Sequence, residues 1–301
     1  MKNANCLLIK TSAEIALKSN PVRNHFTKKL VTNIKLSLKA NQVDYEKISR
    51  GGGRLYLFSP QLEKAAAVLQ KVIGVHAIAF SFQGNWKNLE EIEQQILQHA
   101  KAYFKKGDSF ALHARRTAKT NFTSKDLENK IGQKIMDSIQ GLKVDLSKPK
   151  KEIFIEVRKK DFFIFFEEIS CIRGLPVGVE GSAAFLFQGK ENEGLAAFLM
   201  LFRGCNIFPV VQKPSKKIEK ILQKLTPFNA FRGFIVTELK DLPALIEERQ
   251  LQAIATGDSS LTKASLKSYA EFDSKQSIAV LRPLLLYPKQ LLNEKRGFFE
   301  S

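Results

Sequence analysis

The amino-acid sequence predicts an α+β N-terminal half followed by an α/β doubly wound parallel-sheet domain. Three observations support this prediction. Up to residue 75, strands and helices follow one another in a β-α-β-α order, and a second unit that ends in a hairpin comes next. A segment rich in glycine and proline, 174–181, then marks a linker. Beyond it, short apolar strands alternate with helical segments, which is typical of βαβ units.

The first unit is predicted to contain two strands and two helices. The strands are 5–10 and 54–59, and the helices are 19–40 and 61–73. In the longer helix the apolar side chains recur every four residues, which gives one apolar stripe. Asn20 is expected to cap this helix, and Pro21 suits its first turn. The stripe consists of Val22, Phe26, Leu30, Ile34 and Leu38.

The second unit is predicted to contain two strands, two helices and a hairpin. The strands are 75–81 and 108–114, the helices are 88–104 and 123–139, and the hairpin is 151–168. Thr123 and Asp126 have the spacing of a capping box at the start of the second helix. The hairpin is expected to turn near residues 159–161.

The third unit carries the alternating pattern. Its predicted strands are 183–187, 205–211, 231–237, 252–258 and 276–285. Ligands of doubly wound sheets bind at the carboxyl ends of the strands. The segments 188–193 and 257–260 are therefore expected at a ligand site.

The composition favours a folded protein with an anionic partner. Hydrophobic residues make up 44% and charged residues 26% of the 301 positions, which suits a packed core. The net charge is +18, which points first to a polyanion and second to an anionic membrane. Residues 1–178 carry 31 Lys and Arg against 17 Asp and Glu, and residues 179–301 carry 17 against 13. The basic surface is therefore expected mainly in the N-terminal half.

Neither a metal site nor a catalytic set follows from residue spacing. Cys6, Cys171 and Cys205 are far apart, and the four histidines have no ligand at a usable spacing. No nucleophile, base and orienting group can be assigned. The N-terminal apolar run is too short for a signal peptide, and no stretch reaches about 18 apolar residues. A cytoplasmic protein without a membrane partner is expected.

Three basic segments are candidates for RNA contact. HARRTAKTNFTSKD, residues 113–126, places guanidinium and ammonium groups beside a capped helix start, which suits phosphate oxygens. A solvated basic loop is the alternative interpretation. SRGGGR, residues 49–54, allows close backbone approach to a ligand, but it also fits a tight connector. The start of the first long helix is the third segment. The candidate residues are Lys18, Arg23, Arg50, Arg54, Arg115, Arg116, Lys119 and Lys125.

Together, several segments resemble the tRNA 4-thiouridine synthetases, which are thiamine-biosynthesis-type sulfurtransferases. Residues 14–34 and 50–58 resemble the opening of that family, and 111–135 and 155–181 resemble its THUMP domain and linker. Residues 195–210, 256–265 and 281–292 resemble pieces of its PP-loop ATPase domain. The similarity keeps its order over nearly the whole chain.

The resemblance implies three domains and an activity. It implies an N-terminal ferredoxin-like domain at 1–75, a THUMP domain at 76–178 and a PP-loop ATPase-like domain at 179–301. In the family the first two domains bind tRNA. The third adenylylates a uridine with ATP, and a cysteine persulfide supplies the sulfur.

The first nucleotide loop departs from the family pattern Ser-Gly-Gly-x-Asp-Ser. Gln188 and Gly189 stand at its first two positions, Lys190 replaces the second glycine, Asn192 the aspartate and Glu193 the second serine. A carboxylate there opposes a phosphate, because two like charges about 4 Å apart repel by about 1 kcal/mol in water and about 4 kcal/mol near a protein surface. Asn192 is expected to cap the following helix, and Glu193 to act as an internal anion.

The second loop is partly kept. Gly257, Asp258 and Ser259 match the family, whereas Leu261 and Thr262 depart from it. The family's sulfur-carrying cysteine has no counterpart in the sequence. Both loops are therefore expected to be vestigial, with no catalytic residue and no metal ligand.

Three functions remain open from the sequence. The favoured one is a tRNA-binding protein without a cofactor that presents tRNA to a modifying enzyme. The second is an active tRNA sulfurtransferase that uses ATP with Mg²⁺ and a partner's cysteine. The third is a structural subunit of an active paralogue. A homodimer is plausible for the family.

Overall fold

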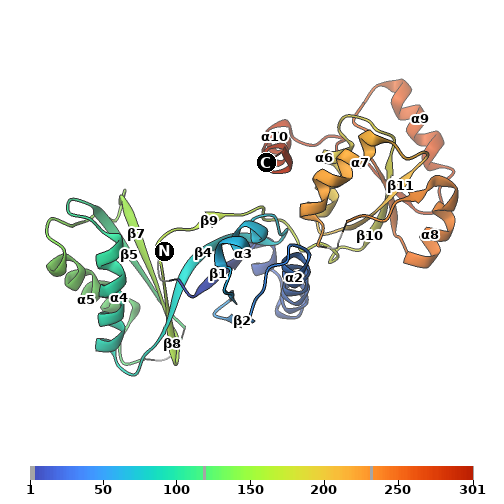
Figure 1. Ribbon diagram of the computed structural model, residues 1–301. Helices are drawn as coiled ribbons and strands as arrows, with labels where there is room; N and C mark the ends of the chain where they lie inside the picture. The colour runs from blue at the N-terminus through green and yellow to red at the C-terminus, as the bar shows by residue number, and fades with distance from the viewer. Residues whose placement is uncertain (1–3, 118–119, 231–232, 301) are drawn as a thin grey trace. The chain divides into compact units, whose positions relative to one another are not determined.

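The computed structural model of the chain describes residues 4–117, 120–230 and 233–300. The chain divides into two compact units. The first comprises Met1–Lys10, Asp44–Ala66 and Ala77–Ser170, and the second comprises Thr11–Val43, Ala67–His76 and Cys171–Ser301. Figure 1 follows the chain from the N-terminal strands to the C-terminal helix α10.

The first unit is built on one sheet, in which strands far apart in the sequence pair with one another. Its strand order is β2 (Lys47–Gly51), β3 (Arg54–Phe58), β1 (Cys6–Thr11), β4 (Val75–Asn85), β8 (Asp161–Phe165), β7 (Lys151–Val157), β5 (Ser109–Arg116) and β6 (Lys143–Val144), and β9 (Ile169–Ser170) pairs with β4. β4 has 11 residues and links the strands of the first predicted unit to those of the second. The hairpin prediction is confirmed, because Val157 pairs with Phe162.

Two helices cover one face of this sheet. Helices α4 (Leu89–Tyr103) and α5 (Ser124–Ser138) lie beside β5 and β7 in Figure 1. Their apolar residues, such as Ile96 and Ile131, pack in one core with Ile153 and Ile155 of β7. Alternate residues of the same hairpin pack with β1 and β3 in a second core. The predicted capping box at the start of α5 is confirmed.

The second unit contains the long predicted helix, α2 (Asn20–Ala40), preceded by α1 (Ala13–Ala16). Phe26, Leu30, Ile34 and Leu38 of its stripe are buried, whereas Val22 is 38% exposed. The predicted cap is wrong by one residue, because Ser19 stands at the N-cap position and Asn20 is already helical. The side chain of Asn20 instead accepts a hydrogen bond from the guanidinium of Arg23. Helix α3 (Leu62–Leu69) runs from the first unit into the second.

The second sheet confirms the doubly wound prediction. Its order is β12 (Thr237–Glu238), β11 (Asn206–Val211), β10 (Ser182–Phe187), β13 (Ala253–Thr256) and β14 (Ala279–Leu281). Each neighbouring pair is parallel. The chain first builds outward from β10 through β11 to β12, and then returns to the other side of β10 as β13. The point where the order reverses is therefore the crevice between β10 and β13.

Helices cover both faces of this sheet, as Figure 1 shows. One face packs against α6 (Glu193–Phe202), α7 (Lys216–Leu225) and α10 (Lys289–Glu300). The other packs against α8 (Leu242–Arg249) and α9 (Lys263–Asp273). Two short 3₁₀ turns, Thr226–Phe228 and Leu239–Asp241, complete the described elements.

The predicted strand 231–237 is wrong over most of its length. Phe231 and Arg232 lie outside the described residues, and β12 consists of Thr237 and Glu238 alone. Ile235 is 83% exposed, so this apolar run does not face the core. Among the described residues, β12 pairs with β11 through Val210 with Thr237 and Val211 with Glu238, so the local strand propensity of the apolar run is not matched by ladder partners.

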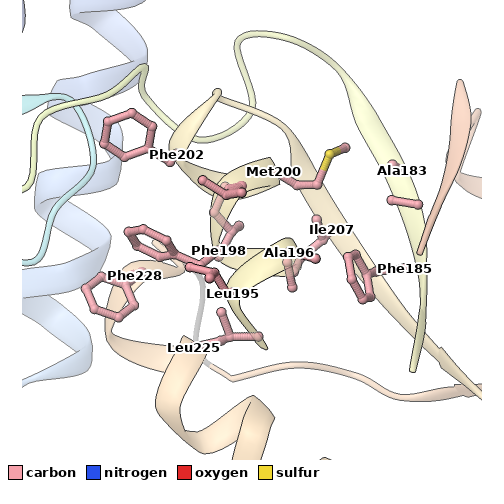
Figure 2. Packing of buried hydrophobic residues seen from close by; sticks show 14 of the residues in the cluster. Ala183, Phe185, Leu195, Ala196, Phe198, Met200, Phe202, Ile207, Leu225 and Phe228 are labelled. Atoms are coloured by element: carbon pink, nitrogen blue, oxygen red, sulfur yellow. The ribbon is translucent and has the colours of Figure 1, made fainter. Parts of the chain in front are cut away.

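The core of the second unit is centred on α6. Every residue of this helix is buried. Phe198 lies amid the cluster in Figure 2, with its ring centroid 5.0 Å from Phe228 and 5.7 Å from Phe299. Because α6 follows directly on the loop 188–192, this packing fixes the position of the loop.

Replacement of Phe198 by alanine is expected to lower the free energy of unfolding by about 3–5 kcal/mol, because it leaves a cavity in a closed core. Urea unfolding followed by circular dichroism measures the change. The control is Ile235→Ala in the same unit, which should stay within about 0.5 kcal/mol of the wild type because its side chain is exposed. A loss under about 1 kcal/mol for Phe198→Ala would contradict the packing of Phe198 against Phe228 and Phe299.

Candidate functional site

A cavity lies at the carboxyl ends of β10 and β13, at the point where the strand order reverses. Its volume is about 530 Å³. Both loops singled out in the sequence line it, the first with Gln188, Lys190 and Asn192 and the second with Gly257, Asp258 and Ser259. The parallel topology brings these loops together, since carboxyl ends of neighbouring strands meet at one edge of a sheet.

The carboxylate of Glu193 lies over the first loop. It accepts hydrogen bonds from the backbone N–H of Gln188 and of Gly189, each at 2.8 Å and each to a different oxygen. The Glu193 residue is only 1% exposed. Gly189 has φ +79°, a left-handed conformation that favours glycine. Two amide groups at the start of the loop are thus engaged by a side chain of the same chain.

Gly257 closes over Glu193 from the second loop. A Cβ atom at position 257 would lie 2.6 Å from Cγ and 3.0 Å from Cα of Glu193. Such distances are too short for any side chain, so glycine is required for this approach. The two loops are therefore packed directly on each other at Glu193.

The environment of Glu193 shifts the pKa of its carboxyl group. Burial raises the pKa of the Glu193 carboxyl, while the N–H groups of Gln188, Gly189 and Lys190 and the charge of Lys190 act in the opposite direction. Burial prevails, so the pKa of Glu193 is raised above its ordinary value.

An ion pair joins the two loops across the cavity. Lys190 Nζ lies 2.8 Å from Asp258 Oδ1, and the hydroxyl of Thr256 donates to Oδ2 at 2.9 Å. Burial alone would raise the pKa of Asp258, but the hydrogen bonds from Lys190 and Thr256 and the charges of Lys190 and Arg282 outweigh it and lower the pKa. Asp258 is thus held as a carboxylate.

Arg282 also lines the cavity, and it is not among the site residues predicted from the sequence. Arg282 follows β14 and forms two hydrogen bonds with Asp273, of 2.9 and 2.7 Å. Its guanidinium carbon lies 4.3 Å from the centroid of the Tyr269 ring. Position 282 comes directly after a strand of a parallel sheet, so the rule that found the two loops also points to it.

The predicted cap at Asn192 is wrong. Asn192 stands at the N-cap position of α6, but its side chain forms no capping bond. Its φ of −93° and ψ of 3° differ from the extended conformation in which a cap side chain reaches the N–H groups. Its Oδ1 instead accepts a hydrogen bond of 3.4 Å from Arg296 of α10.

Among residues 4–117, 120–230 and 233–300, no group of three or more His, Cys, Asp and Glu side chains is placed to hold a metal ion. In the same ranges, no helix combines the length and the apolar character needed to cross a bilayer.

Arg115 and Arg116 of the segment 113–126 lie at the carboxyl end of β5. Arg115 and Arg116 are successive strand residues, so they point to opposite faces of the sheet. Arg115 is exposed, and Arg116 is half-buried with Nη1 3.4 Å from the Thr120 hydroxyl. Lys125 is exposed in the first turn of α5. Lys119 lies outside the described residues.

The three glycines of 49–54 form a hairpin turn. Gly52 and Gly53 have φ of +59° and +77°, and Gly51 pairs with Arg54, which defines a two-residue type I′ connection. A Cβ atom on Gly52 would lie 3.3 Å from Cγ2 of Thr117. The turn that carries Arg50 and Arg54 therefore lies beside the end of β5.

Arg54 is not available at the surface as expected from the sequence. Its side chain is 16% exposed, and its Nε lies 2.8 Å from Oε2 of the buried Glu156. Arg158 lies 3.5 Å from the other oxygen of Glu156 and donates to Gly51 O and to the Tyr56 hydroxyl, both at 2.6 Å. These residues fasten the β2–β3 hairpin to the β7–β8 hairpin.

The remaining candidates, Lys18 and Arg23, belong to the second unit. Both are exposed near the start of α2. Lys18 Nζ lies 5.8 Å from the centroid of the Phe26 ring, and Arg23 donates to Ala16 O at 3.5 Å. Their charged groups remain accessible to solvent.

Family models match two parts of the chain. Residues 6–79 match the ThiI ferredoxin-like domain, and residues 87–167 match the THUMP domain. The chain is therefore a THUMP-domain protein with a ThiI-type ferredoxin-like domain before it, as the resemblance implied.

The curated proteins to which the chain is similar are named tRNA sulfurtransferases. It is 33% identical over 205 residues to a probable tRNA sulfurtransferase of Methanobrevibacter smithii, an alignment over 67% of this chain and 52% of that protein. It is 29% identical over 204 residues to the tRNA sulfurtransferase of Blochmanniella pennsylvanica, over 67% of this chain and 42% of that protein. The chain thus spans about half the length of the curated relatives it matches.

Two solved structures share the whole fold. PH1313 from Pyrococcus horikoshii matches with a TM-score of 0.87 and 26% identity, covering 99% of this chain and all of that one. A 4-thiouridine synthetase, solved in an RNA complex with bound ATP, matches with a TM-score of 0.78 and 22% identity over 99% of this chain and 85% of that one. The chain thus resembles the 4-thiouridine synthetases in fold throughout.

The raised pKa of Glu193 predicts a pH dependence. Between pH 4.5 and its folded-state pKa, the folded chain holds the proton and the unfolded chain does not. The stability that Glu193 contributes is therefore complete below pH 4.5 and is lost as the pH rises through the folded-state pKa. The difference in free energy of unfolding, wild type minus Glu193→Gln, should fall with rising pH.

Urea unfolding at pH 4 to 8 measures this difference. Glu191→Gln is the matched control, because it removes one carboxylate from the same loop. A difference that rises with pH would contradict the burial of the Glu193 carboxyl.

Proposed function

We propose that the protein binds tRNA with its N-terminal half and presents it to a tRNA-modifying enzyme, while its C-terminal domain no longer uses ATP. The domains of this proposal are a ferredoxin-like domain at 1–75, a THUMP domain at 76–178 and a PP-loop-like domain at 179–301. The family matches to both N-terminal parts and the basic charge of residues 1–178 support the RNA partner. We also propose that the protein is cytoplasmic, as expected from the sequence.

The proposed loss of ATP use rests on one observation, the hydrogen bonds between the Glu193 carboxylate and the loop N–H groups. The carboxylate of Glu193 accepts the N–H groups of Gln188 and Gly189, which a phosphate would otherwise receive at the start of a strand–loop–helix unit. A phosphate in the loop would have to displace a buried side chain that Gly257 holds in place. It would also meet a negative charge, at a cost of about 1 to 4 kcal/mol for two charges 4 Å apart.

Lys190 offsets only part of this repulsion. Its ammonium group is 2.8 Å from Asp258, so its charge is already paired across the cavity. The residues present therefore do not fit a nucleotide triphosphate bound to the loop, and we derive no adenylylation step for this chain.

The proposed tRNA surface consists of exposed cations near the end of β5. Arg115, Lys125 and Arg50 of the hairpin turn are exposed, and Arg116 lies beside the start of α5. Guanidinium groups bind phosphate oxygens in pairs, and a helix N-terminus adds N–H donors. Lys18 and Arg23 of the second unit are proposed as further tRNA contacts, as is Lys119, which lies outside the described residues; Arg54 is paired with Glu156 instead.

An active ATP-dependent sulfurtransferase is the second candidate. It is favoured by the polar cavity, which keeps Gly257, Asp258 and Ser259 in the second loop. The relatives of the chain are named tRNA sulfurtransferases, and the matching synthetase structure holds ATP. In this candidate Mg²⁺ would accompany ATP, and a partner would supply the cysteine.

Calorimetry with Mg-ATP separates the two candidates. The wild type is expected to give no heat at millimolar nucleotide, because the loop amides are already engaged. The variant Lys190→Gly with Glu193→Ser leaves the net charge unchanged but removes the carboxylate that occupies two N–H groups of the loop, so it should bind ATP more tightly than the wild type. Millimolar or tighter binding by the wild type would favour the active enzyme instead.

Salt titrations of tRNA binding test the RNA surface. Arg115→Ala and Arg116→Ala should each weaken binding and reduce the slope of log K against log salt by about 0.7–0.9, the value of one phosphate contact. Arg115→Lys keeps the charge and should keep the slope. Lys64→Gln, at an exposed position on α3, controls for net charge. Wild-type protein that binds no tRNA at low salt, or binds without a salt slope, would refute the proposed function.

A further inference from the structure

A second group of cations lies at the other end of the sheet that carries Arg115. Two loops meet there, residues 105–108 before β5 and residues 145–150 before β7. The lysines of these loops and of β6 are exposed. This group, called the lysine surface here, consists of Lys105, Lys106, Lys143, Lys148 and Lys150.

Asp108 holds the two loops together. Its side chain is 5% exposed and accepts the Lys105 N–H at 2.9 Å, and it lies 3.0 Å from Lys151 Nζ and 3.2 Å from Lys150 Nζ. These partners, the Lys105 N–H first, hold the pKa of Asp108 well below its usual range. The Asp108 carbonyl also accepts the N–H of Lys143 at 3.1 Å. The carboxylate of Asp108 thus positions lysines from two segments, and its backbone carbonyl positions Lys143 from a third.

Asp145 shapes the second loop in the same way. Its Oδ1 accepts the N–H groups of Ser147 and Lys148, both at 2.9 Å, and its own N–H donates to Phe110 O at 2.9 Å. The two acidic groups of this region are therefore used to fix the backbone and to hold Lys150 and Lys151. In the part of the chain that the structure describes, Lys105, Lys106, Lys143 and Lys148 form no ion pair, in contrast to Lys150 and Lys151.

We propose that the lysine surface is a second contact site for the RNA backbone, separate from the arginines at the far end of β5; this inference rests on the proposed tRNA binding. Strand β5 has 8 residues. At about 3.3 Å per residue, the two sites are roughly 23 Å apart on one rigid sheet. A long polyanion such as a folded RNA can reach both, whereas a single phosphate group cannot.

The chemistry of the surface favours RNA over a membrane. Its charges are ammonium groups on preformed loops, which bind phosphates without regard to base sequence. Membrane-binding segments instead pair such charges with a broad apolar helix face. Here the exposed apolar side chains within the loops are Val144 and Leu146.

Removing four charges tests the proposal. The quadruple variant Lys105→Gln, Lys106→Gln, Lys143→Gln, Lys148→Gln is compared with a control that loses four exposed lysines of the second unit, Lys213→Gln, Lys216→Gln, Lys220→Gln, Lys224→Gln. Binding of full-length tRNA is measured from 50 to 300 mM salt. The lysine-surface variant should weaken binding at least tenfold and lower the salt slope by about 3, since each lost phosphate contact lowers it by 0.7–0.9. The control should stay within twofold of the wild type.

A variant that keeps the four positive charges controls for misfolding. Arginine at the same four positions should restore the slope, and the unfolding midpoints of all variants should agree. The loss should also add, in log K, to that of Arg115→Ala, because the sites are far apart and share no partner.

Two results would overturn the inference about the lysine surface and leave the proposed tRNA binding intact. One is wild-type tRNA binding that depends on Arg115 while the lysine-surface variant matches the control. The other is an unchanged tRNA slope together with lost binding to vesicles containing phosphatidylserine, which would assign the surface to a membrane. Wild-type protein that binds no tRNA would overturn the proposed function as well, so the two failures are distinct.

Discussion

The pairing of the Glu193 carboxylate with two loop amides governs the C-terminal domain. It engages the N–H groups of Gln188 and Gly189, buries a carboxyl at the start of α6 and requires glycine at position 257. Burial raises the pKa of this carboxyl, and the N–H donors offset only part of the cost of desolvation. A strand–loop–helix unit normally offers these donors to a phosphate. Here the chain supplies the acceptor itself, and the cavity beside it keeps its serines and cations.

A second buried charge decides which arginines can meet a partner in the N-terminal half. Glu156 lies on β7 between Arg54 and Arg158, and both guanidinium groups turn toward it. Charged groups taken out of water must be paired, so Arg54 cannot also serve an external phosphate. The same cluster fixes the glycine turn beside Thr117, which brings Arg50 close to the end of β5. Arginines that look equivalent in the sequence thus differ in the structure, because Arg54 is paired with a buried carboxylate and Arg50 is exposed.

The acidic residues of the N-terminal half are largely used for internal support. Asp108 and Asp145 bind backbone N–H groups, and Asp126 closes the capping box of α5. Because these carboxylates are held inside loops and helix starts, the excess of lysine and arginine in residues 1–178 is left on the surface. That arrangement gives a basic sheet with cations at both ends of β5, and it agrees with a partner that is a large polyanion rather than a small ligand.

The sequence by itself determined the capping box, the β7–β8 hairpin and the alternation of strands and helices in the parallel sheet, because these depend on local periodicity and on residues within a few positions of one another. It also located both loops of the cavity, since parallel topology brings strand ends together. Only the tertiary structure decided that Asn192 does not cap α6, that β12 is two residues long and that Arg54 is paired with Glu156. Each of these depends on residues distant in sequence whose charges and hydrogen bonds are paired through space, which no local pattern records.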